Sequence, residues 1–393
     1  MKYKQLSFKT GYKLYIDEVG GFNFQLNRWV TTGFASQEEI ESIAGDIEGF
    51  GTWQSRFLHL AKTAEHEKRL LHAAIYYRAV DFFAEAGTAQ KADAYHSFLN
   101  LFSEAMKDQD IERIEVPYES AFLPLLRLRP EGRAKGTILI HGGYDSYKEE
   151  LYPMASYLAN RGYEIVLFDG PGQGESLHRY GLTLTPDWHY PVSAIIDHLG
   201  LDDVTVVGIS LGGCLALRAA AFEKRITRVV ALDHFYDWGR CMAKRRHDPY
   251  HSSILAYALL RVMLCFPRSF DRRLLKKLET NYKAAWVFNQ GCHITGSKSP
   301  HAYFEAIMRY STKPINRLIT QDVLILAGEE DHAVPVDLYP KQLRALNNAA
   351  SVEGRLFTVK EEGAQHCQIG NLPLVLDYIL EWTMRKTRNT VSL

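Results

Sequence analysis

A serine between two glycines is the first feature of this sequence that could do chemistry. In the segment GISLGG, Ser210 follows the apolar run at 204–207 and precedes the alanine-rich run at 215–222. A sharp strand-to-helix turn would lift its hydroxyl off a sheet, and glycines at 208 and 212 let the two backbones approach closely. The pattern predicts a nucleophilic serine, with the backbone amide of Leu211 available to bind an oxyanion.

A carboxylate and an imidazole that could activate this serine follow it in the chain. Asp331 lies in GEEDHAVP at the end of an apolar run, and His366 lies in GAQHC after the last predicted strand. An aspartate can hold a histidine in the tautomer that accepts the serine proton, and the chain order Ser, Asp, His occurs in one large hydrolase fold. Three alternatives for the acid stay open: Glu329, Glu330 and Asp233.

Two glycines after an earlier predicted strand supply a second candidate for oxyanion binding. In HGGYD, the amide of Gly143 or Tyr144 would pair with that of Leu211. We expect His141 itself to be packed or hydrogen-bonded rather than to act as a base. The glycine-rich loop at 169–176 fits neither a phosphate-binding loop nor the dinucleotide spacing, so we interpret it as part of the rim of the site.

Composition and charge exclude several other classes of protein. Lys+Arg and Asp+Glu both number 46, so no bulk attraction to nucleic acid or to a membrane is expected. The sequence has no apolar run long enough for a transmembrane helix and begins without the apolar region of a secretory signal. The five scattered cysteines indicate neither a disulfide framework nor a metal site. We expect a cytoplasmic protein with no metal, no cofactor and a small-molecule substrate as its partner, and a homodimer remains open.

The elements that must position these residues change character near residue 115. From about Ser36 to Met106 the sequence predicts helices, with a capping box at Ser36 and Glu39 and a break at Gly87-Thr88. The first 34 residues carry no assignment. Beyond residue 115 apolar strands alternate with helices, which predicts an α/β fold with a mostly parallel sheet. Strands are expected at 123–128, 137–141, 164–169, 204–208, 228–232, 323–328 and 355–359, and helices at 148–161, 211–222 and 373–385.

The long interval between the strands ending at 232 and starting at 323 interrupts this alternation. Helices are expected there at 254–265, at 269–285 with Ser269 as N-cap, and at 302–311. A single crossover helix needs far fewer residues, so we interpret the interval at about 234–320 as a helical lid insertion. The expected organisation is an N-terminal helical cap domain at 1–115 followed by the sheet domain at 116–393.

Four segments resemble the FrsA-like α/β-hydrolases: GGYDSYKEE at 142–150, DGPGQGES, GISLGG and GAQHCQIGN at 363–371. The helix LHAAIYYRAVDFF is similar to the helical cap of that family, which includes fungal yellowish-green pigment polyketide hydrolases, 2,6-dihydropseudooxynicotine hydrolase and bacterial polyketide-shortening enzymes. The resemblance implies an α/β-hydrolase fold, a pocket between cap and sheet, and a triad of Ser210, Asp331 and His366. Several members cleave carbon–carbon bonds in β-diketone-like substrates. The nicotine-pathway member also uses an extra acidic residue, for which Asp233 and Asp237 are the nearest candidates.

Together these observations predict a serine hydrolase that acts on a hydrophobic, aromatic or polyketide-like small molecule. The reaction would be retro-Claisen cleavage of a β-diketone through an acyl-enzyme, or hydrolysis of an ester or thioester, because the same residues serve both leaving groups. An acylaminoacyl-type peptidase and a non-catalytic binding module are the remaining alternatives. Tyr76 and Tyr77 of the cap and Tyr257 of the lid are expected to contact the substrate, with packing in a core as the alternative for each. Asp233, at the end of a strand, is a further expected substrate contact.

Overall fold

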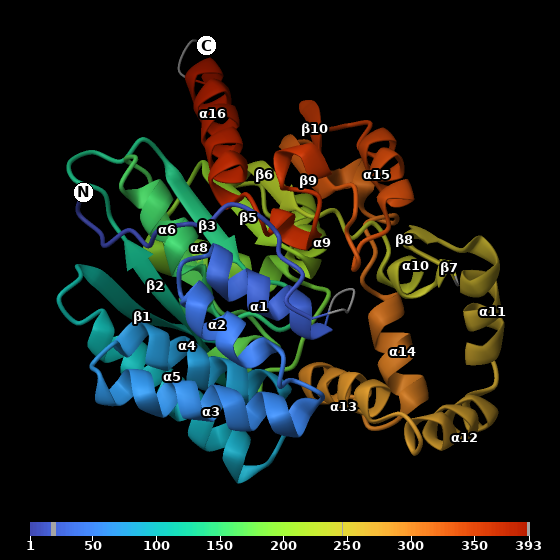
Figure 1. The fold of residues 1–393 in the computed structure, drawn as a ribbon. Coiled ribbons are helices and arrows are strands. Elements are labelled where there is room, and N and C mark those ends of the chain that lie inside the picture. The colour runs from blue at the N-terminus through green and yellow to red at the C-terminus, as the bar shows by residue number, and fades with distance from the viewer. Residues whose placement is uncertain (17–20, 246, 391–393) are drawn as a thin grey trace.

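An eight-stranded sheet forms the centre of the fold (Figure 1). The computed structural model describes residues 1–16, 21–245 and 247–390. The strands lie in the order β1-β2-β4-β3-β5-β6-β9-β10. β2 pairs antiparallel with β1 and with β4, and every other neighbouring pair is parallel. The bounds are β1 Ile111–Tyr118, β2 Ala121–Leu128, β3 Thr137–His141, β4 Glu164–Phe168, β5 Val204–Ile209, β6 Ile226–Leu232, β9 Asp322–Gly328 and β10 Ser351–Phe357.

The two edge strands differ from the sequence-based expectation. β1 has no counterpart among the predicted strands, and β10 begins at Ser351, earlier than the expected range of 355–359. Along β1 only Val116 is buried, and β10 alternates between partly buried and exposed positions until Phe357. An edge strand of this kind carries no continuous apolar run, so the signal that located the inner strands is missing. The inner strands lie within two residues of their expected ranges.

Alternate side chains of the inner strands enter two hydrophobic cores. In β3, Ile138 and Ile140 join one core and Leu139 joins the other, as the two-residue period of a strand requires. The first core packs against α6 (Tyr152–Ala159), α16 (Leu372–Thr390) and the N-terminal helices, and the second packs against α8 (His189–Leu199) and α9 (Leu211–Phe222). The sheet is therefore buried on both faces, which confirms the expected α/β architecture.

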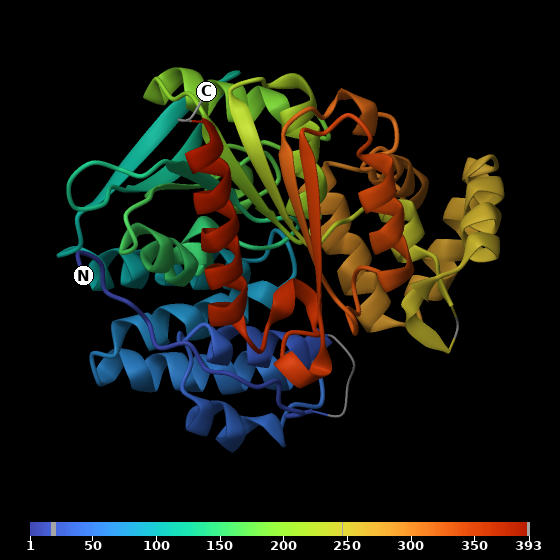
Figure 2. The same ribbon diagram turned by 90° about the horizontal axis from the view of Figure 1, so that it is seen from above.

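Five helices precede the sheet in the described part of the chain, and Figure 2 shows them gathered on one side of it. Ser36 caps α2 by accepting the amide of Glu39, but the Glu39 carboxylate binds Arg69 and Tyr76, so only half of the predicted capping box forms. Thr88 caps α5 as predicted. The helix bounds are α1 Gly21–Thr31, α2 Gln37–Ala44, α3 Phe50–His66, α4 Leu70–Phe83 and α5 Ala89–Ala105.

One hydrophobic core runs through both the N-terminal helices and the sheet. It contains Trp29 of α1 and Trp53 of α3 together with Ile138 of β3. The division into two domains at residue 115 stays a prediction, because the two parts share this core. Within the described ranges, no helix combines the length and the apolar character that crossing a membrane requires.

The lid interval projects from the carboxyl-terminal side of β6 (Figure 1). The expected helix at 269–285 is wrong in two respects. Pro267 occupies the first turn of α12, so Ser269 is not its N-cap, and the helix ends at Leu278. Asn281 then caps a separate helix by accepting the amide of Ala284. The elements are α10 Trp238–Met242, β7 Lys244–Arg245, β8 Asp248–Ser252, α11 Ile254–Leu264, α12 Pro267–Leu278, α13 Tyr282–Thr295 and α14 Pro300–Met308.

Short helices occupy several of the loops around the sheet. The helix expected at 148–161 begins as the 3-10 turn η1 (Lys148–Leu151) and continues as α6. The turn η5 (His366–Gln368) follows β10 and brings His366 to the carboxyl ends of the strands. The others are α7 Gly174–His178, η2 Asn316–Leu318, η3 Val336–Leu338, α15 Tyr339–Ala345 and η4 Val359–Glu361.

Candidate active site

Ser210 lies at the sharp turn between β5 and α9, as the sequence pattern predicts. Its backbone has φ of 62° and ψ of −127°, a conformation that residues with a Cβ rarely adopt. Glycines surround this turn because the backbone is crowded: a Cβ at Gly208 would meet the carbonyl of Gly212. The packing of β5 against α9 thus holds the serine hydroxyl at the end of the strand.

His366 joins Ser210 to Asp331 through two hydrogen bonds. The Nε2 atom of His366 is 2.8 Å from Ser210 Oγ, and its Nδ1 atom is 2.8 Å from Asp331 Oδ2. The other carboxylate oxygen of Asp331 accepts the backbone amides of Ala333 at 2.7 Å and Val334 at 2.9 Å. The loop after β9 therefore fixes Asp331, which in turn orients the imidazole towards the serine.

Glu329 and Glu330, the neighbouring candidates for the acid, point to other partners. Glu329 Oε1 accepts the backbone amide of Val359, and Glu330 Oε2 accepts the side-chain amide of Gln365. Of the three acidic residues after β9, only Asp331 reaches the imidazole.

Asp233 lies behind His366 instead of lining a substrate cavity. Its Oδ2 atom is 2.8 Å from His366 Nδ1, the same distance as that of Asp331. The same oxygen accepts the amide of Cys367 at 2.7 Å, and Oδ1 accepts the side-chain amide of Gln368 at 2.9 Å. The expectation that Asp233 contacts the substrate is corrected here: the carboxyl is fully buried and its oxygens are occupied by the His366 turn.

The two carboxyls and the imidazole shift one another's ionisation. Burial by itself lowers the pKa of His366, but Asp331 and Asp233 outweigh it and raise that pKa well above 6.5. Burial opposes ionisation of Asp233, yet His366 and the hydrogen bonds from residues 367 and 368 lower its pKa to about 2. Burial, together with the charge of Asp233, raises the pKa of Asp331. Asp233 is therefore the more readily ionised of the two.

The backbone of Gly143 packs directly against the start of α9. A Cβ at this position would lie 2.6 Å from the amide nitrogen of Leu211 and 2.9 Å from that of Gly212. Only glycine permits this approach, which places the Gly143-Tyr144 segment beside the Leu211 amide. The segments that carry the three predicted oxyanion donors are thus neighbours in space.

Gln173 orients this segment, and sequence reasoning did not single it out. Its side-chain amide donates to the carbonyls of Gly142 and Gly143, each at 2.8 Å. Because both carbonyls point towards Gln173, the peptide planes around Gly143 are fixed. His141 bonds the carbonyl of Gly142 through Nδ1 and the indole of Trp188 through Nε2, the structural role expected for it. The only signal for Gln173 was its place in the glycine-rich loop at the rim.

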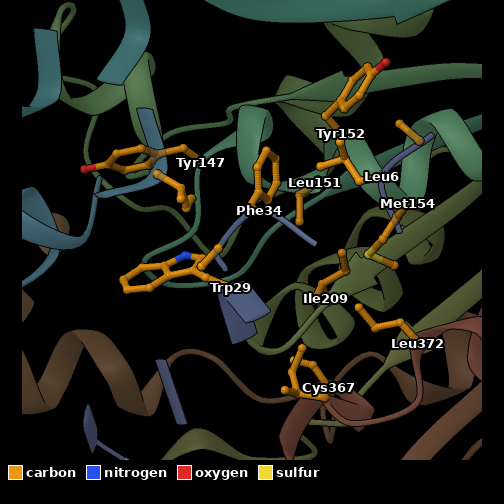
Figure 3. Close-up of a cluster of buried hydrophobic side chains, with 14 of the residues drawn as sticks. Leu6, Trp29, Phe34, Tyr147, Leu151, Tyr152, Met154, Ile209, Cys367 and Leu372 are labelled. Carbon is orange, nitrogen blue, oxygen red and sulfur yellow. The ribbon is translucent and has the colours of Figure 1, made fainter. Parts of the chain in front are cut away.

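A cavity beside Ser210 and His366 lies between α1 and the ends of the strands. Its walls are largely apolar, and they include Ile209, Met154, Leu151 and Leu372, which Figure 3 labels in a cluster of buried hydrophobic side chains. Phe24 and Arg28 of α1, a helix without any sequence assignment, and Thr32 directly after it complete the lining. The Phe24 ring lies 5.7 Å from the His366 ring, so α1 covers the imidazole.

Comparison with known proteins identifies the family. A model of the alpha/beta hydrolase fold matches residues 138–369, more than half of the chain. This chain belongs to the α/β-hydrolase family. A Fusarium protein named Hydrolase LUC6 is 27% identical over 92% of this chain and 95% of its own length, and an Acremonium protein named Alpha/beta hydrolase ucsC is 25% identical over 82% and 77%. The crystal structure of 2,6-dihydroxy-pseudo-oxynicotine hydrolase shares the fold with a TM-score of 0.66 at 20% identity, covering 90% of this chain and 94% of that one. Because the chain belongs to this family and its relatives are named hydrolases, it is a hydrolytic enzyme.

The three tyrosines expected to contact substrate lie elsewhere in this α/β-hydrolase. Tyr76 is buried in the cap with its hydroxyl 2.6 Å from Glu39, and Tyr77 donates to Glu65 at 3.0 Å. Tyr257 of α11 donates to Asp237 in the lid. None of the three is among the residues that line the cavity beside Ser210. Helical periodicity predicts only that these tyrosines lie on the apolar faces of their helices. In the structure those faces pack within the cap and the lid and do not border the cavity.

A buried charged network joins the cap of the α/β-hydrolase to the loop that carries Gly143. Arg78 of α4 donates to Glu150 at 3.1 Å, to Asp81 at 2.6 Å and to the backbone carbonyl of Asp145 at 2.5 Å. Glu150 also forms an ion pair with Arg28 of α1, at 3.0 Å. Since Arg28, Asp145 and Glu150 line the cavity, this network sets the shape of its polar end.

One group in the described ranges of this α/β-hydrolase has the composition of a metal site. Asp233, His366 and Cys367 bring one ligand atom each within 4.8 Å of one another. Burial raises the pKa of the Cys367 thiol to about 12, whereas metal binding needs the thiolate. Both Asp233 oxygens also carry hydrogen bonds. These residues fit the hydrogen-bonded site around His366 better than they fit a metal.

Proposed function

We propose that this α/β-hydrolase uses Ser210, His366 and Asp331 to cleave the carbon–carbon bond of a β-diketone in a hydrophobic, polyketide-like small molecule. The observation that carries the proposal is the unbroken chain from Ser210 Oγ through His366 to Asp331, with both links at 2.8 Å. The apolar cavity beside it supports a hydrophobic substrate. The choice of a β-diketone rests on the resemblance to the FrsA-like hydrolases.

The proposed reaction proceeds through an acyl-enzyme. Ser210 Oγ bonds to one carbonyl carbon while its proton moves to His366 Nε2, and the oxyanion accepts hydrogen bonds from the amide of Leu211 and that of Gly143 or Tyr144. The bond between this carbon and the central carbon of the diketone then breaks, its electron pair forms an enolate, and the imidazolium returns the proton to that carbon. Water, deprotonated by His366, releases the acyl group as a carboxylic acid and restores Ser210.

Hydrolysis of a carboxylic ester or thioester is the second candidate, and the same geometry supports it. The attacking serine, the base and the oxyanion donors are unchanged, and the proton of His366 passes to an alkoxide or thiolate instead of a carbon. The proposal and this alternative therefore differ only in the leaving group.

Turnover of matched substrates distinguishes the two. We expect the purified enzyme to cleave an aryl 1,3-diketone into a carboxylic acid and a methyl ketone, with kcat/KM above that for the aryl ester of the same acid. Products are measured by liquid chromatography, and a fluorophosphonate probe counts the reactive serine in parallel. Ester turnover without any diketone turnover would establish the alternative. An unlabelled Ser210 with no turnover of either substrate would reject both.

The pH dependence of the reaction follows from the environment of His366. Only the neutral imidazole accepts the serine proton, so activity is lost as the pH falls through the pKa of His366. Because Asp331 and Asp233 raise this pKa despite burial, kcat/KM should rise with a midpoint above pH 6.5. Initial rates between pH 5 and 9 at substrate concentrations well below KM measure that midpoint. A midpoint below 6.5 would contradict the raised pKa.

A further inference from the structure

Two carboxylates, rather than one, contact the same nitrogen of His366. Asp331 Oδ2 and Asp233 Oδ2 are both 2.8 Å from Nδ1, and both side chains are buried, with 2% and 0% exposure. We propose that Asp233 is a second positioning carboxylate for His366, able to hold the imidazole in its active tautomer when Asp331 is absent. This inference rests on the proposed function of His366 as the base.

The two acids reach His366 from separate parts of the fold. Asp331 follows β9, whereas Asp233 follows β6 and has a backbone φ of 70°, a conformation costly for a residue with a Cβ. The carbonyl of Asp233 packs so closely against α9 that a Cβ at Gly213 would meet it. Neighbouring structure therefore holds Asp233 in place independently of the loop that carries Asp331.

The hydrogen bonds of Asp233 reach the turn that carries the base. It accepts the amide of Cys367 at 2.7 Å and the side chain of Gln368 at 2.9 Å, the two residues that follow His366. Its contact with Nδ1 has the distance of an ion pair, while Asp331 also has the alignment of a hydrogen bond. One N–H can be shared between two acceptors, so a small rotation of the ring would transfer the bond to Asp233.

Other ionisable groups near His366 do not offer the same support. Burial lowers the pKa of His234 to about 4 and that of His332 to about 3, and it raises that of Cys367 to about 12, so all three are neutral at pH 7. Burial raises the pKa of Asp145, after β3, and the nearby charge of His366 partly opposes that shift. Among the residues that the structure describes, Asp233 and Asp331 are the two carboxylates in contact with the imidazole.

Two substitutions of Asp331 test the proposal, because they differ in what they offer to Nδ1. An asparagine can donate its amide hydrogens to Nδ1 and impose the inactive tautomer, a change that costs about 10⁴-fold in a serine hydrolase with one acid. An alanine donates nothing and leaves Nδ1–H to Asp233. We therefore expect the kcat of Asp331→Ala to be at least tenfold higher than that of Asp331→Asn, with KM unchanged. The kcat of the double variant Asp331→Ala/Asp233→Asn should fall to the level of Asp331→Asn. Equal rates for Asp331→Ala and the double variant would overturn the proposal.

A second measurement keeps the proposal open to refutation if Asp331→Ala does not fold. In Asp233→Asn the triad acid is intact, and we expect the midpoint of fluorophosphonate labelling against pH to move to lower pH than in the wild type. An unchanged midpoint in a folded Asp233→Asn variant would overturn the proposal. Asp197→Asn, which alters an exposed surface pair with Arg225, serves as the control. Wild-type enzyme that neither labels nor turns over would instead reject the proposed function itself.

Discussion

Replacing Ser210 with alanine is expected to lower kcat by about 10⁶-fold, the scale seen when the nucleophile of a serine hydrolase is removed. In the proposed mechanism the hydroxyl bonds to the substrate carbon, and His366 Nε2 lies 2.8 Å from it. Without the hydroxyl, neither the acyl-enzyme nor the transfer of its proton can occur. Single-turnover assays on the diketone and its matched ester measure the loss.

Substrate binding and folding should survive this change. Ser210→Ala removes one oxygen at a turn whose other contacts are backbone packing, so the melting temperature is expected to stay close to that of the wild type. Ser55→Ala is a matched control, because that serine is exposed on α3 and its hydroxyl bonds only the carbonyl of Thr52. Activity in Ser210→Ala within tenfold of the wild type would show that another group is the nucleophile.

Arg78→Ala is expected to destabilise the fold by about 3–5 kcal/mol, the range observed when one partner of a buried ion pair is removed. The guanidinium is 2% exposed and lies 3.8 Å from the centre of the Tyr147 ring. It bonds Asp81 and Glu150, both of which are buried. Removing it leaves two buried carboxylates with fewer cationic partners and opens a space among them. Chemical denaturation followed by circular dichroism measures the free energy of unfolding.

The same variant should lose activity, because Arg78 also holds the backbone carbonyl of Asp145 at 2.5 Å. Asp145 follows the Gly143-Tyr144 segment directly, so a loosened carbonyl displaces the proposed oxyanion donors. Arg56→Ala is the control: its pair with Asp46 is about half exposed on both sides and is expected to contribute at most about 1 kcal/mol. Equal stability losses in the two variants would contradict the role assigned to the buried network.

Local patterns in the sequence located the inner strands, the turn at Ser210, and the residues Asp331 and His366 that the structure joins to it by hydrogen bonds. Each of these signals is short-range: glycines around a serine after an apolar run predict a tight turn, and Asp331 and His366 each follow a strand. Because the carboxyl ends of parallel strands meet at one edge of a sheet, strand order alone brings such residues close. The edge strand β1 escaped prediction because partial exposure removes the apolar signal.

Contacts between distant segments decided which residues line the cavity and which carboxylates reach His366. No pattern in residues 21–31 indicates that Phe24 and Arg28 of α1 line the cavity, because their contribution depends on how the cap docks on the sheet. Helical periodicity predicts that Tyr76 lies on an apolar face, but it does not distinguish a face that packs in a core from one that lines a cavity. In the structure Tyr76 is buried in the core. The sequence placed Asp233 at a strand end, but only the packing of β6 beside the turn after β10 brings its carboxylate to His366. Chemical type is a property of single residues, whereas proximity across the fold depends on the summed packing of all its elements.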